Sequence, residues 1–244
     1  CTLMSCSTET GGSATTTYEI EGVAFLGRTF REYCQLFGLE PAALTDKRVL
    51  DCPGGASGFR AGAAARGAAA YAVDPVYGAP TEAVASRARR DLRRAMDALD
   101  DVEELYVWET YDDADELESH RWSALGRFLA DYEASPGRYL PAALPRLPFP
   151  TDSFDLVCCS HLLCLYADEF DHAFHAAALR ELCRVARGEV RVFPLVDFST
   201  RRYEGLDDLL LALERHGHDP EIRPVDFEFQ RGGVACLLVD THNR

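Results

Sequence analysis

A glycine-rich turn follows a short buried strand in the sequence VLDCPGGASGF. Gly54 and Gly55 permit a tight turn and a close approach of the backbone to a ligand. The strand ends at Asp51, and Ser57 or Gly58 begins a helix whose free amide groups face the same crevice. We therefore expect this turn to form one side of a binding site for a nucleoside-like ligand.

A second acidic residue, Asp74, stands at the end of the next predicted strand, in the sequence AAAYAVDP. At this place in a nucleotide-binding α/β sheet, a carboxylate accepts two hydrogen bonds from a ribose diol. A helix N-cap and a solvated loop acid are the other interpretations of this residue. Together with the glycine turn, Asp74 favours nucleoside binding.

A histidine follows the strongest predicted strand, SFDLVCCSHL. His161 would lie at the ligand-facing edge of the sheet, where an imidazole can take a proton from a hydroxyl group. Local packing or hydrogen bonding is an equally good interpretation of this histidine. His172 and His175 are spaced to share a helix face and could join His161 or Asp168 around a metal ion. Because histidines on surface helices are far more common than metal ligands, we expect no metal site.

From Lys47 onward, predicted strands and helices alternate along the chain. This alternation predicts a parallel sheet covered on both faces, with right-handed crossovers, and a hairpin at the end adds an antiparallel strand. Val225, Phe227 and Phe229 alternate with acids, as in a half-buried strand. The expected strands are 47–52, 68–75, 102–110, 137–144, 153–162, 189–196, 222–229 and 234–240. The expected helices are a segment around 30–37 that stops at Gly38, and 57–66, 81–99, 114–133, 169–187 and 206–216.

Composition narrows the classes of function. The chain has 244 residues, 47% of them hydrophobic, and a formal net charge of −15. Such an acidic chain repels phosphate backbones, so nucleic acid is not the expected partner, although high salt weakens this argument. Lys47 is the only lysine, which fits either adaptation to salt or a bias toward arginine codons. No apolar run approaches the ~20 residues needed to cross a bilayer, so we expect no membrane partner.

The nine cysteines cannot all pair within the chain. Cys158 and Cys159 are adjacent in an apolar strand and so point to opposite faces. We interpret the cysteines as buried thiols, which indicates a reducing, cytoplasmic compartment. Residues 1–17 are rich in Ser, Thr and Gly and predict a loose tail, and a first residue other than methionine indicates a fragment or a start at Met4. Residues 18–244 are expected to form a single domain.

From about Lys47 to Val239, the sequence resembles the class I S-adenosylmethionine-dependent methyltransferases. LPFPTDSFDLVCCSHLL is similar to the stretch that leads through the fourth strand in the small-molecule branch, which is related to quinone-biosynthesis methyltransferases. LRELCRVARGEVRVFPL resembles the following helix and fifth strand, and the final hairpin matches the antiparallel seventh strand of the family. The resemblance implies a Rossmann-like, doubly wound, mostly parallel seven-stranded sheet.

The resemblance also implies S-adenosylmethionine as the cofactor and a small molecule as the methyl acceptor. We expect residues 103–135 to form an inserted strand or cap near the acceptor side. We also expect the amino-terminal helix, with Tyr33, to close over the cofactor. The resemblance implies that the methionine end of the cofactor is bound by Asp51, Gly54, Gly55 and Ser57. It implies that Asp74 binds the ribose and that Pro75 and Val76 contact the adenine. Ser160 and His161 would lie between the methionine part and the acceptor. In the insert, Trp108, Tyr111, Trp122 and Phe128 either line an apolar pocket or pack within the insert.

Three departures from the family pattern qualify these expectations. Pro53 replaces the usual first glycine of the turn, and Ala143 stands where the family often has an acid beside the adenine. Cys158, Cys159, Ser160 and His161 occupy the place of the Asn/Asp-Pro-Pro-aromatic motif of many amino-group methyltransferases, which favours an oxygen, carbon or sulfur acceptor. A nicotinamide-dependent oxidoreductase and a non-catalytic S-adenosylmethionine-binding protein remain the alternative functions.

Overall fold

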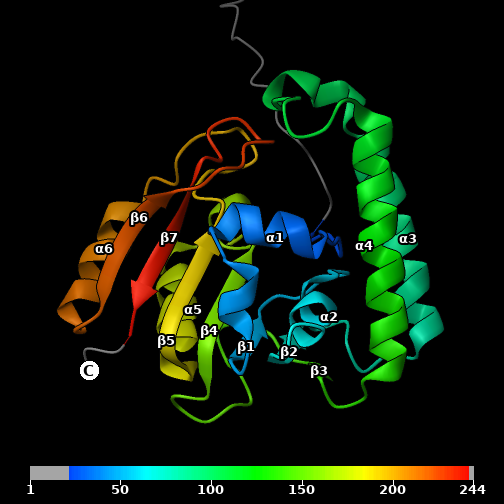
Figure 1. Ribbon diagram of the computed structural model, residues 1–244. Helices are drawn as coiled ribbons and strands as arrows, with labels where there is room; N and C mark the ends of the chain where they lie inside the picture. Colours follow the sequence, from blue (N-terminus) through cyan, green and yellow to red (C-terminus); the bar gives the residue numbers. More distant parts are fainter. Residues whose placement is uncertain (1–21, 242–244) are drawn as a thin grey trace, which may run out of the picture.

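The computed structural model describes residues 22–241. One seven-stranded sheet organises these residues, in the order β3-β2-β1-β4-β5-β7-β6 (Figure 1). The expected tail over 1–17 lies outside the described residues. The strands are β1 (Arg48–Asp51), β2 (Ala69–Val73), β3 (Tyr139–Leu140), β4 (Phe154–Ser160), β5 (Ala186–Phe193), β6 (Asp219–Pro224) and β7 (Ala235–Asp240).

The first five strands are parallel, and the last two are antiparallel. β1 pairs with β2 on one side and with β4 on the other, so that Asp51 stands beside Ala72 and Cys158. β7 pairs antiparallel with β5 and with β6. The carboxyl ends of β1, β2 and β4 therefore meet at one edge of the sheet. This topology confirms the expected Rossmann-like sheet with its antiparallel hairpin.

Helices cover both faces of the sheet. α5 and α6 pack on the face that contains Cys159, whereas α1 and α2 pack on the face that contains Cys158. The long helices α3 and α4 lie side by side at the β3 end of the sheet (Figure 1). The helices are α1 (Phe30–Phe37), α2 (Phe59–Ala64), α3 (Thr81–Asp97), α4 (Ala114–Ala134), α5 (His172–Val185) and α6 (Leu206–Arg215), with 3-10 turns η1 (Pro41–Leu44), η2 (Asp100–Leu105) and η3 (Cys164–Tyr166).

Local sequence explains where α1 begins and ends. Thr29 and Glu32 form a capping box, in which each side chain accepts a hydrogen bond from the other residue's backbone N–H. Gly38 ends the helix in the left-handed conformation, at φ 59°. Because Tyr33 and Phe37 are buried on the sheet side, the helix is fixed over the carboxyl end of β1.

The prediction of a strand over 102–110 is wrong. The chain there forms η2 and then makes a single antiparallel bridge between Tyr106 and Gln230. The Val107 N–H donates to the Phe229 carbonyl at 2.6 Å, so this segment pairs with a distant loop instead of joining the sheet.

The strand expected over 222–229 lies in a different place. β6 ends at Pro224, which has no N–H to continue the ladder, and residues 225–229 continue as a loop. Phe227 and Phe229 are nevertheless buried, because they pack against the side chains of α1 and of the 106–111 segment. The alternation of apolar residues identified their burial correctly but not their secondary structure.

β6 is the outer strand at this end of the sheet. Most of its residues are exposed, including Ile222. Pro220 and Pro224 carry no N–H donor, and Glu221 pairs with Arg223 at 2.7 Å. The last strand of the order is therefore short, polar and rich in proline.

Candidate functional site

A cavity of about 130 Å³ lies at the carboxyl ends of β1 and β4. Gly54 and Gly55 line it from the turn after β1, and Ser160 and His161 line it from the end of β4. Tyr33 of α1 closes another side. The structure thus brings together residues that the sequence analysis had placed in one site.

A second cavity of about 380 Å³ adjoins the first. Pro75, Val76 and Ala143 line it. Pro53 and Asp74 line both cavities, so the two spaces share a wall at the tip of β2. A ligand with two chemically different ends would fit this paired arrangement.

Asp74 is 7% exposed, and its two carboxylate oxygens accept backbone hydrogen bonds. Gly55 N–H donates to Oδ2 at 3.2 Å, and Val76 N–H donates to Oδ1 at 3.0 Å. Burial raises the pKa of Asp74 to about 6, while these two hydrogen bonds act in the opposite direction. Since each oxygen has two lone pairs, the carboxylate keeps acceptor capacity for the hydroxyl groups of a ligand.

Asp51 is more deeply buried and lines neither cavity. Its Oδ1 accepts a hydrogen bond from the Tyr33 hydroxyl at 3.1 Å, whereas its buried Oδ2 has no hydrogen-bond partner among the described residues. Burial raises the pKa of Asp51 well above its ordinary value, and the Tyr33 hydrogen bond partly offsets that rise. A cationic group of a ligand is the kind of partner that would satisfy Oδ2.

The sequence predicted free amides at the start of the helix after the turn, but Gly58 N–H donates to the Arg28 carbonyl and Phe59 N–H donates to Ser57 Oγ. The amides of the glycine turn also have acceptors within the protein. Gly54 N–H donates to the Val73 carbonyl, and Gly55 N–H donates to Asp74 Oδ2. Ala56 N–H donates to the Leu26 carbonyl, and Ser57 N–H donates to the Gly54 carbonyl. The amides therefore hold the turn together instead of facing a ligand.

Ser57 follows the glycine turn and is buried. Its hydroxyl accepts a hydrogen bond from Phe59 N–H at 2.9 Å and contacts the Arg28 carbonyl at 3.3 Å. The residue is 3% exposed and lines neither cavity. The Ser57 hydroxyl therefore contacts backbone groups next to the start of α2, and its expected place at the methionine end stays a prediction.

A segment that the sequence analysis did not assign to the site crosses the glycine turn at contact distance. A Cβ atom on Gly27 would lie 1.9 Å from the Ala56 carbonyl oxygen, and one on Gly55, where φ is +52°, would lie 2.3 Å from the Leu26 carbonyl oxygen. We call residues 23–28 the crossing segment. Its Val23 and Ala24 line both cavities.

His161 occupies a constrained position at the end of β4. Its φ is 50°, its N–H donates to the Phe193 carbonyl at 2.6 Å, and its Nδ1 lies 2.7 Å from Ser160 Oγ. Burial lowers the pKa of His161 well below its ordinary value, and the positive charges of Arg28 and Arg121 lower it further. The imidazole is therefore neutral at neutral pH.

A buried ionic cluster borders the cavity beside His161. Arg121 of α4 and the Tyr111 hydroxyl both donate to Glu32 Oε1, while the N–H and hydroxyl of Thr29 both donate to Glu32 Oε2. These interactions outweigh the effect of burial and lower the pKa of Glu32 to about 2. The cluster fixes α1 against α4, and sequence reasoning missed it because its members are far apart in the chain.

The four aromatic residues proposed as a pocket lining in the insert do not line either cavity. Trp108 and Tyr111 pack in the cluster beneath α1, and Trp122 and Phe128 pack in the cluster beside α3. The alternative interpretation, packing within the insert, is also wrong, because these rings pack against side chains outside it, such as Phe229 and Tyr77. Other residues of the insert line the first cavity instead, together with side chains from the loop after β6: Tyr106, Leu117, Arg121, Phe227, Phe229 and Gln230.

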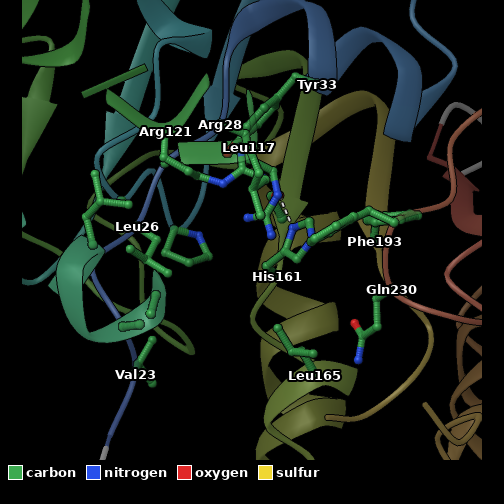
Figure 2. A pocket seen from close by; sticks show the side chains of 18 of the residues that line it. Val23, Leu26, Arg28, Tyr33, Leu117, Arg121, His161, Leu165, Phe193 and Gln230 are labelled. Carbon is green, nitrogen blue, oxygen red and sulfur yellow. Dashed lines mark hydrogen bonds between the residues drawn. The ribbon is translucent and has the colours of Figure 1, made fainter. Parts of the chain in front are cut away.

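Figure 2 shows how these side chains meet. Arg28, Arg121 and Tyr33 lie to one side of the His161 ring, and Phe193 and Gln230 lie to the other. The floor and walls are otherwise largely hydrocarbon. The cavity thus places cations and a neutral imidazole beside an apolar space.

His175, considered above as a metal ligand, has a structural role. Its Nδ1 lies 2.8 Å from the Asp171 carbonyl, and its Nε2 lies 3.1 Å from the Leu163 carbonyl. In residues 22–241, no group of three or more His, Cys, Asp or Glu side chains is arranged to hold a metal ion. Within the same residues, no helix combines the length and apolar character required to span a bilayer.

Known proteins resemble this chain. A family profile described as a methyltransferase domain matches residues 124–193, which include β4, α5 and β5. An uncharacterised protein of Methanocaldococcus jannaschii is 27% identical over 221 residues, covering 90% of this chain and 97% of that protein.

Two solved structures illustrate the likeness of the fold. Magnesium protoporphyrin IX methyltransferase from Synechocystis PCC 6803, with bound S-adenosylmethionine, is 14% identical, with a TM-score of 0.41, over 81% of this chain and 71% of that chain. Precorrin-6y C5,15-methyltransferase from Geobacter metallireducens is 11% identical, with a TM-score of 0.43, over 86% of this chain and 85% of that chain.

Proposed function

We propose that this chain, a class I S-adenosylmethionine-dependent methyltransferase by its family match and strand order, methylates an oxygen, carbon or sulfur atom of a small molecule. The observation that carries the proposal is the position of Asp74, which lines both adjoining cavities next to the turn after β1. A nucleoside bound there would have its ribose at the shared wall. The apolar space beside His161 would receive the acceptor.

The residues present fit the cofactor. Asp74 would bind the ribose hydroxyls, and Pro75 and Val76 would contact the adenine in the larger cavity. Asp51 Oδ2, buried and without a partner among the described residues, would accept a hydrogen bond from the ammonium group of the methionine part. An ammonium group there would also favour the ionised form of Asp51, which burial otherwise disfavours.

When bound, S-adenosylmethionine supplies a methyl group already activated by a sulfonium, so the main task of the protein is to position the acceptor and exclude water. Tyr33 lines the first cavity, and Val23 and Ala24 of the crossing segment line both. The apolar side chains of Phe193 and Leu165 limit the water around the acceptor. A small, largely apolar space and a net charge of −15 both support a small molecule over a nucleic acid.

His161 would accept a proton from an acceptor hydroxyl or thiol. In the tautomer in which Nδ1–H donates to Ser160 Oγ, Nε2 is free as a proton acceptor. The low pKa of His161 keeps the ring neutral and ready for this role at neutral pH. An acceptor that is already ionised, or a carbon nucleophile that is already activated, would not need this step.

Calorimetry on the purified protein tests the proposal. Titration with S-adenosylmethionine and S-adenosylhomocysteine, in buffers from low to molar salt, should show binding of both, whereas NADH should show none. Incubation of the protein with methyl-labelled cofactor and a panel of small phenols, acids and thiols should transfer the label to one class. Absence of binding in every buffer would contradict the proposal, and binding without transfer to any class would support a non-catalytic protein.

A further inference from the structure

Two arginine side chains line the first cavity, and they differ in their ion pairs. Arg28 and Arg121 are the two arginines that line it, and no lysine does. Arg121 forms an ion pair with Glu32. For Arg28, in contrast, the structure of residues 22–241 contains no ion pair with a carboxylate. The cavity is therefore provided with a cation that is available to a ligand.

The backbone of Arg28 is held firmly beside the glycine turn. Its carbonyl accepts hydrogen bonds from Gly58 N–H at 3.0 Å and from Ser57 Oγ at 3.3 Å. Gly27, next to it, fits against the Ala56 carbonyl only because it lacks a side chain. These contacts fix the start of the Arg28 side chain, which extends toward His161 in Figure 2. A fixed origin makes the guanidinium a positioned group and not a mobile surface charge.

Burial lowers the pKa of Arg28 to about 10, and the neighbouring charge of Arg121 acts in the same direction. The side chain is still protonated at neutral pH. The negative charge of Glu32 offsets part of this lowering, but a buried guanidinium that forms no ion pair still costs free energy that an anionic ligand would recover. The surroundings of the guanidinium are thus suited to an anion.

The glycine turn does not supply an alternative group to bind an anion. The amides of Gly54, Gly55, Ala56 and Ser57 all have acceptors within the protein. An anionic group in the first cavity would therefore depend on side-chain donors. A guanidinium matches the planar geometry of a carboxylate and can donate two parallel hydrogen bonds to it.

We propose that Arg28 binds a carboxylate group of a ligand in the first cavity. The inference rests on the proposed function, because that function supplies the two possible carboxylates: the one on the methionine part of the cofactor and one on the methyl acceptor. Both have the same chemistry, and both would neutralise the same guanidinium. The assignment adds a binding residue to the site and a chemical group to the ligand.

Calorimetry with four probes separates the two sources. S-adenosylhomocysteine carries the cofactor carboxylate, and 5′-methylthioadenosine lacks it. Benzoate and benzamide represent the acceptor: benzoate carries a carboxylate on an aromatic ring, and benzamide has an uncharged amide in its place. Benzoate and benzamide are titrated with and without S-adenosylhomocysteine. The variants are Arg28→Met, which removes the charge at similar length, and Arg28→Lys, which keeps it. Arg31→Met is the matched control, because Arg31 is exposed on α1 and lines neither cavity.

Arg28→Met should weaken binding of a carboxylate probe about tenfold or more, with its uncharged counterpart unaffected. A loss confined to S-adenosylhomocysteine identifies the cofactor carboxylate, and a loss confined to benzoate identifies an acceptor carboxylate. Arg28→Lys should restore part of the affinity, and Arg31→Met should bind like the wild type.

Equal affinity of Arg28→Met and wild type for both carboxylate probes would overturn the inference. So would an equal loss for each probe and its uncharged counterpart, since that would indicate a general disturbance of the site. A wild type that binds neither adenosine compound would contradict the proposed function instead. The benzoate titration without S-adenosylhomocysteine would then still decide the role of Arg28.

Discussion

The Tyr33 hydroxyl donates a hydrogen bond to Asp51 Oδ1 at 3.1 Å and thereby joins α1 to the end of β1. This contact connects a helix that covers the first cavity with the carboxyl group that lies behind it. Oδ2 of the same carboxyl is buried and has no hydrogen-bond partner among the described residues.

Replacement of Tyr33 by phenylalanine should weaken cofactor binding. The substitution removes a hydrogen bond that favours the ionised form of Asp51, so the pKa of Asp51 rises further. The affinity for S-adenosylhomocysteine at pH 7, measured by calorimetry, should fall about tenfold. Tyr203→Phe removes a hydroxyl on the other face of the sheet and should leave that affinity unchanged. A Tyr33→Phe variant with wild-type affinity would contradict the role of Asp51.

Protonation of Asp74 should control cofactor affinity near pH 6. The pKa of Asp74 is about 6 in the folded protein, and the ionised form is the better acceptor for ribose hydroxyls. Calorimetry between pH 5 and pH 8 should therefore show weaker binding of S-adenosylhomocysteine as the pH falls below about 6. Asp74→Asn should bind weakly at every pH, whereas Asp226→Asn, at an exposed loop position, should follow the wild-type profile.

Ionisation of Asp74 should lower the free energy of unfolding as the pH rises, whereas it should strengthen cofactor binding. The pKa of Asp74 is higher in the folded state than the ordinary value of 3.8, so the folded state binds the proton more tightly. Its contribution to the free energy of unfolding is fully present below pH 3.8 and is lost as the pH rises through about 6, a change of about 3 kcal/mol. Urea denaturation of wild type and Asp74→Asn from pH 4 to pH 7 measures this difference. Parallel curves for the two proteins would contradict it.

Gly27→Ala should disturb the crossing segment. The new Cβ would lie 1.9 Å from a backbone oxygen, so the segment or the glycine turn must move. We expect a loss of about 2 kcal/mol or more in the free energy of unfolding and weaker binding of S-adenosylhomocysteine. Gly126→Ala is the matched control, since a Cβ there meets no atom within 4 Å and alanine favours the α4 helix. A stable Gly27→Ala protein would contradict the close contact.

Glu32→Gln should be strongly destabilising. The change leaves the buried charge of Arg121 without its counter-ion, which typically costs about 3–5 kcal/mol. Glu189→Gln breaks a more exposed pair with Arg191 and should cost about 1 kcal/mol or less. Thermal and urea denaturation at pH 7 compare the two variants, and similar losses would show that the Glu32 cluster is not a major source of stability.

His161→Asn should separate catalysis from cofactor binding. If the imidazole removes a proton from the acceptor, kcat should fall about 10²–10⁴-fold while the affinity for S-adenosylhomocysteine stays within twofold of wild type. The acceptor identified from the labelled panel provides the assay. An unchanged kcat would show that the acceptor reacts without this proton transfer.

The sequence predicted the parts of the fold that depend on short-range patterns. β1 ends at Asp51 and β2 ends at Val73, directly before Asp74, close to where turn signals and apolar runs predicted. The glycine at position 38 predicted the end of α1, and the structure has it in the left-handed conformation. Residues 102–110 and 225–229 contain strand-forming side chains, but they pair with each other across a large separation in sequence. Their local pattern therefore predicted burial correctly, but the strands that it predicted are not part of the sheet.

The candidate site was predictable where it depends on strand ends, and it was missed where it depends on distant pairs. Asp74, Ser160 and His161 line the first cavity as expected. Thr29 and Glu32 have the spacing of a capping box, but the role of Glu32 beside the cavity depends on Arg121, which is 89 positions away. Arg28 carried no local signal. The expectation of free amides at the start of α2 was wrong because the Arg28 carbonyl, from the crossing segment, accepts the Gly58 N–H. The crossing segment is distant from α2 in sequence, so no local pattern indicated this contact.

The proline-rich outer strand has a consequence for how copies of the protein behave at high concentration. A strand from another molecule could extend the sheet only by pairing with β6. In β6, Pro220 and Pro224 have no N–H group to donate, and the charged pair Glu221–Arg223 lies between them. Edge-to-edge growth of the kind that leads to fibrils is thereby discouraged at the end of the sheet farthest from the ligand site.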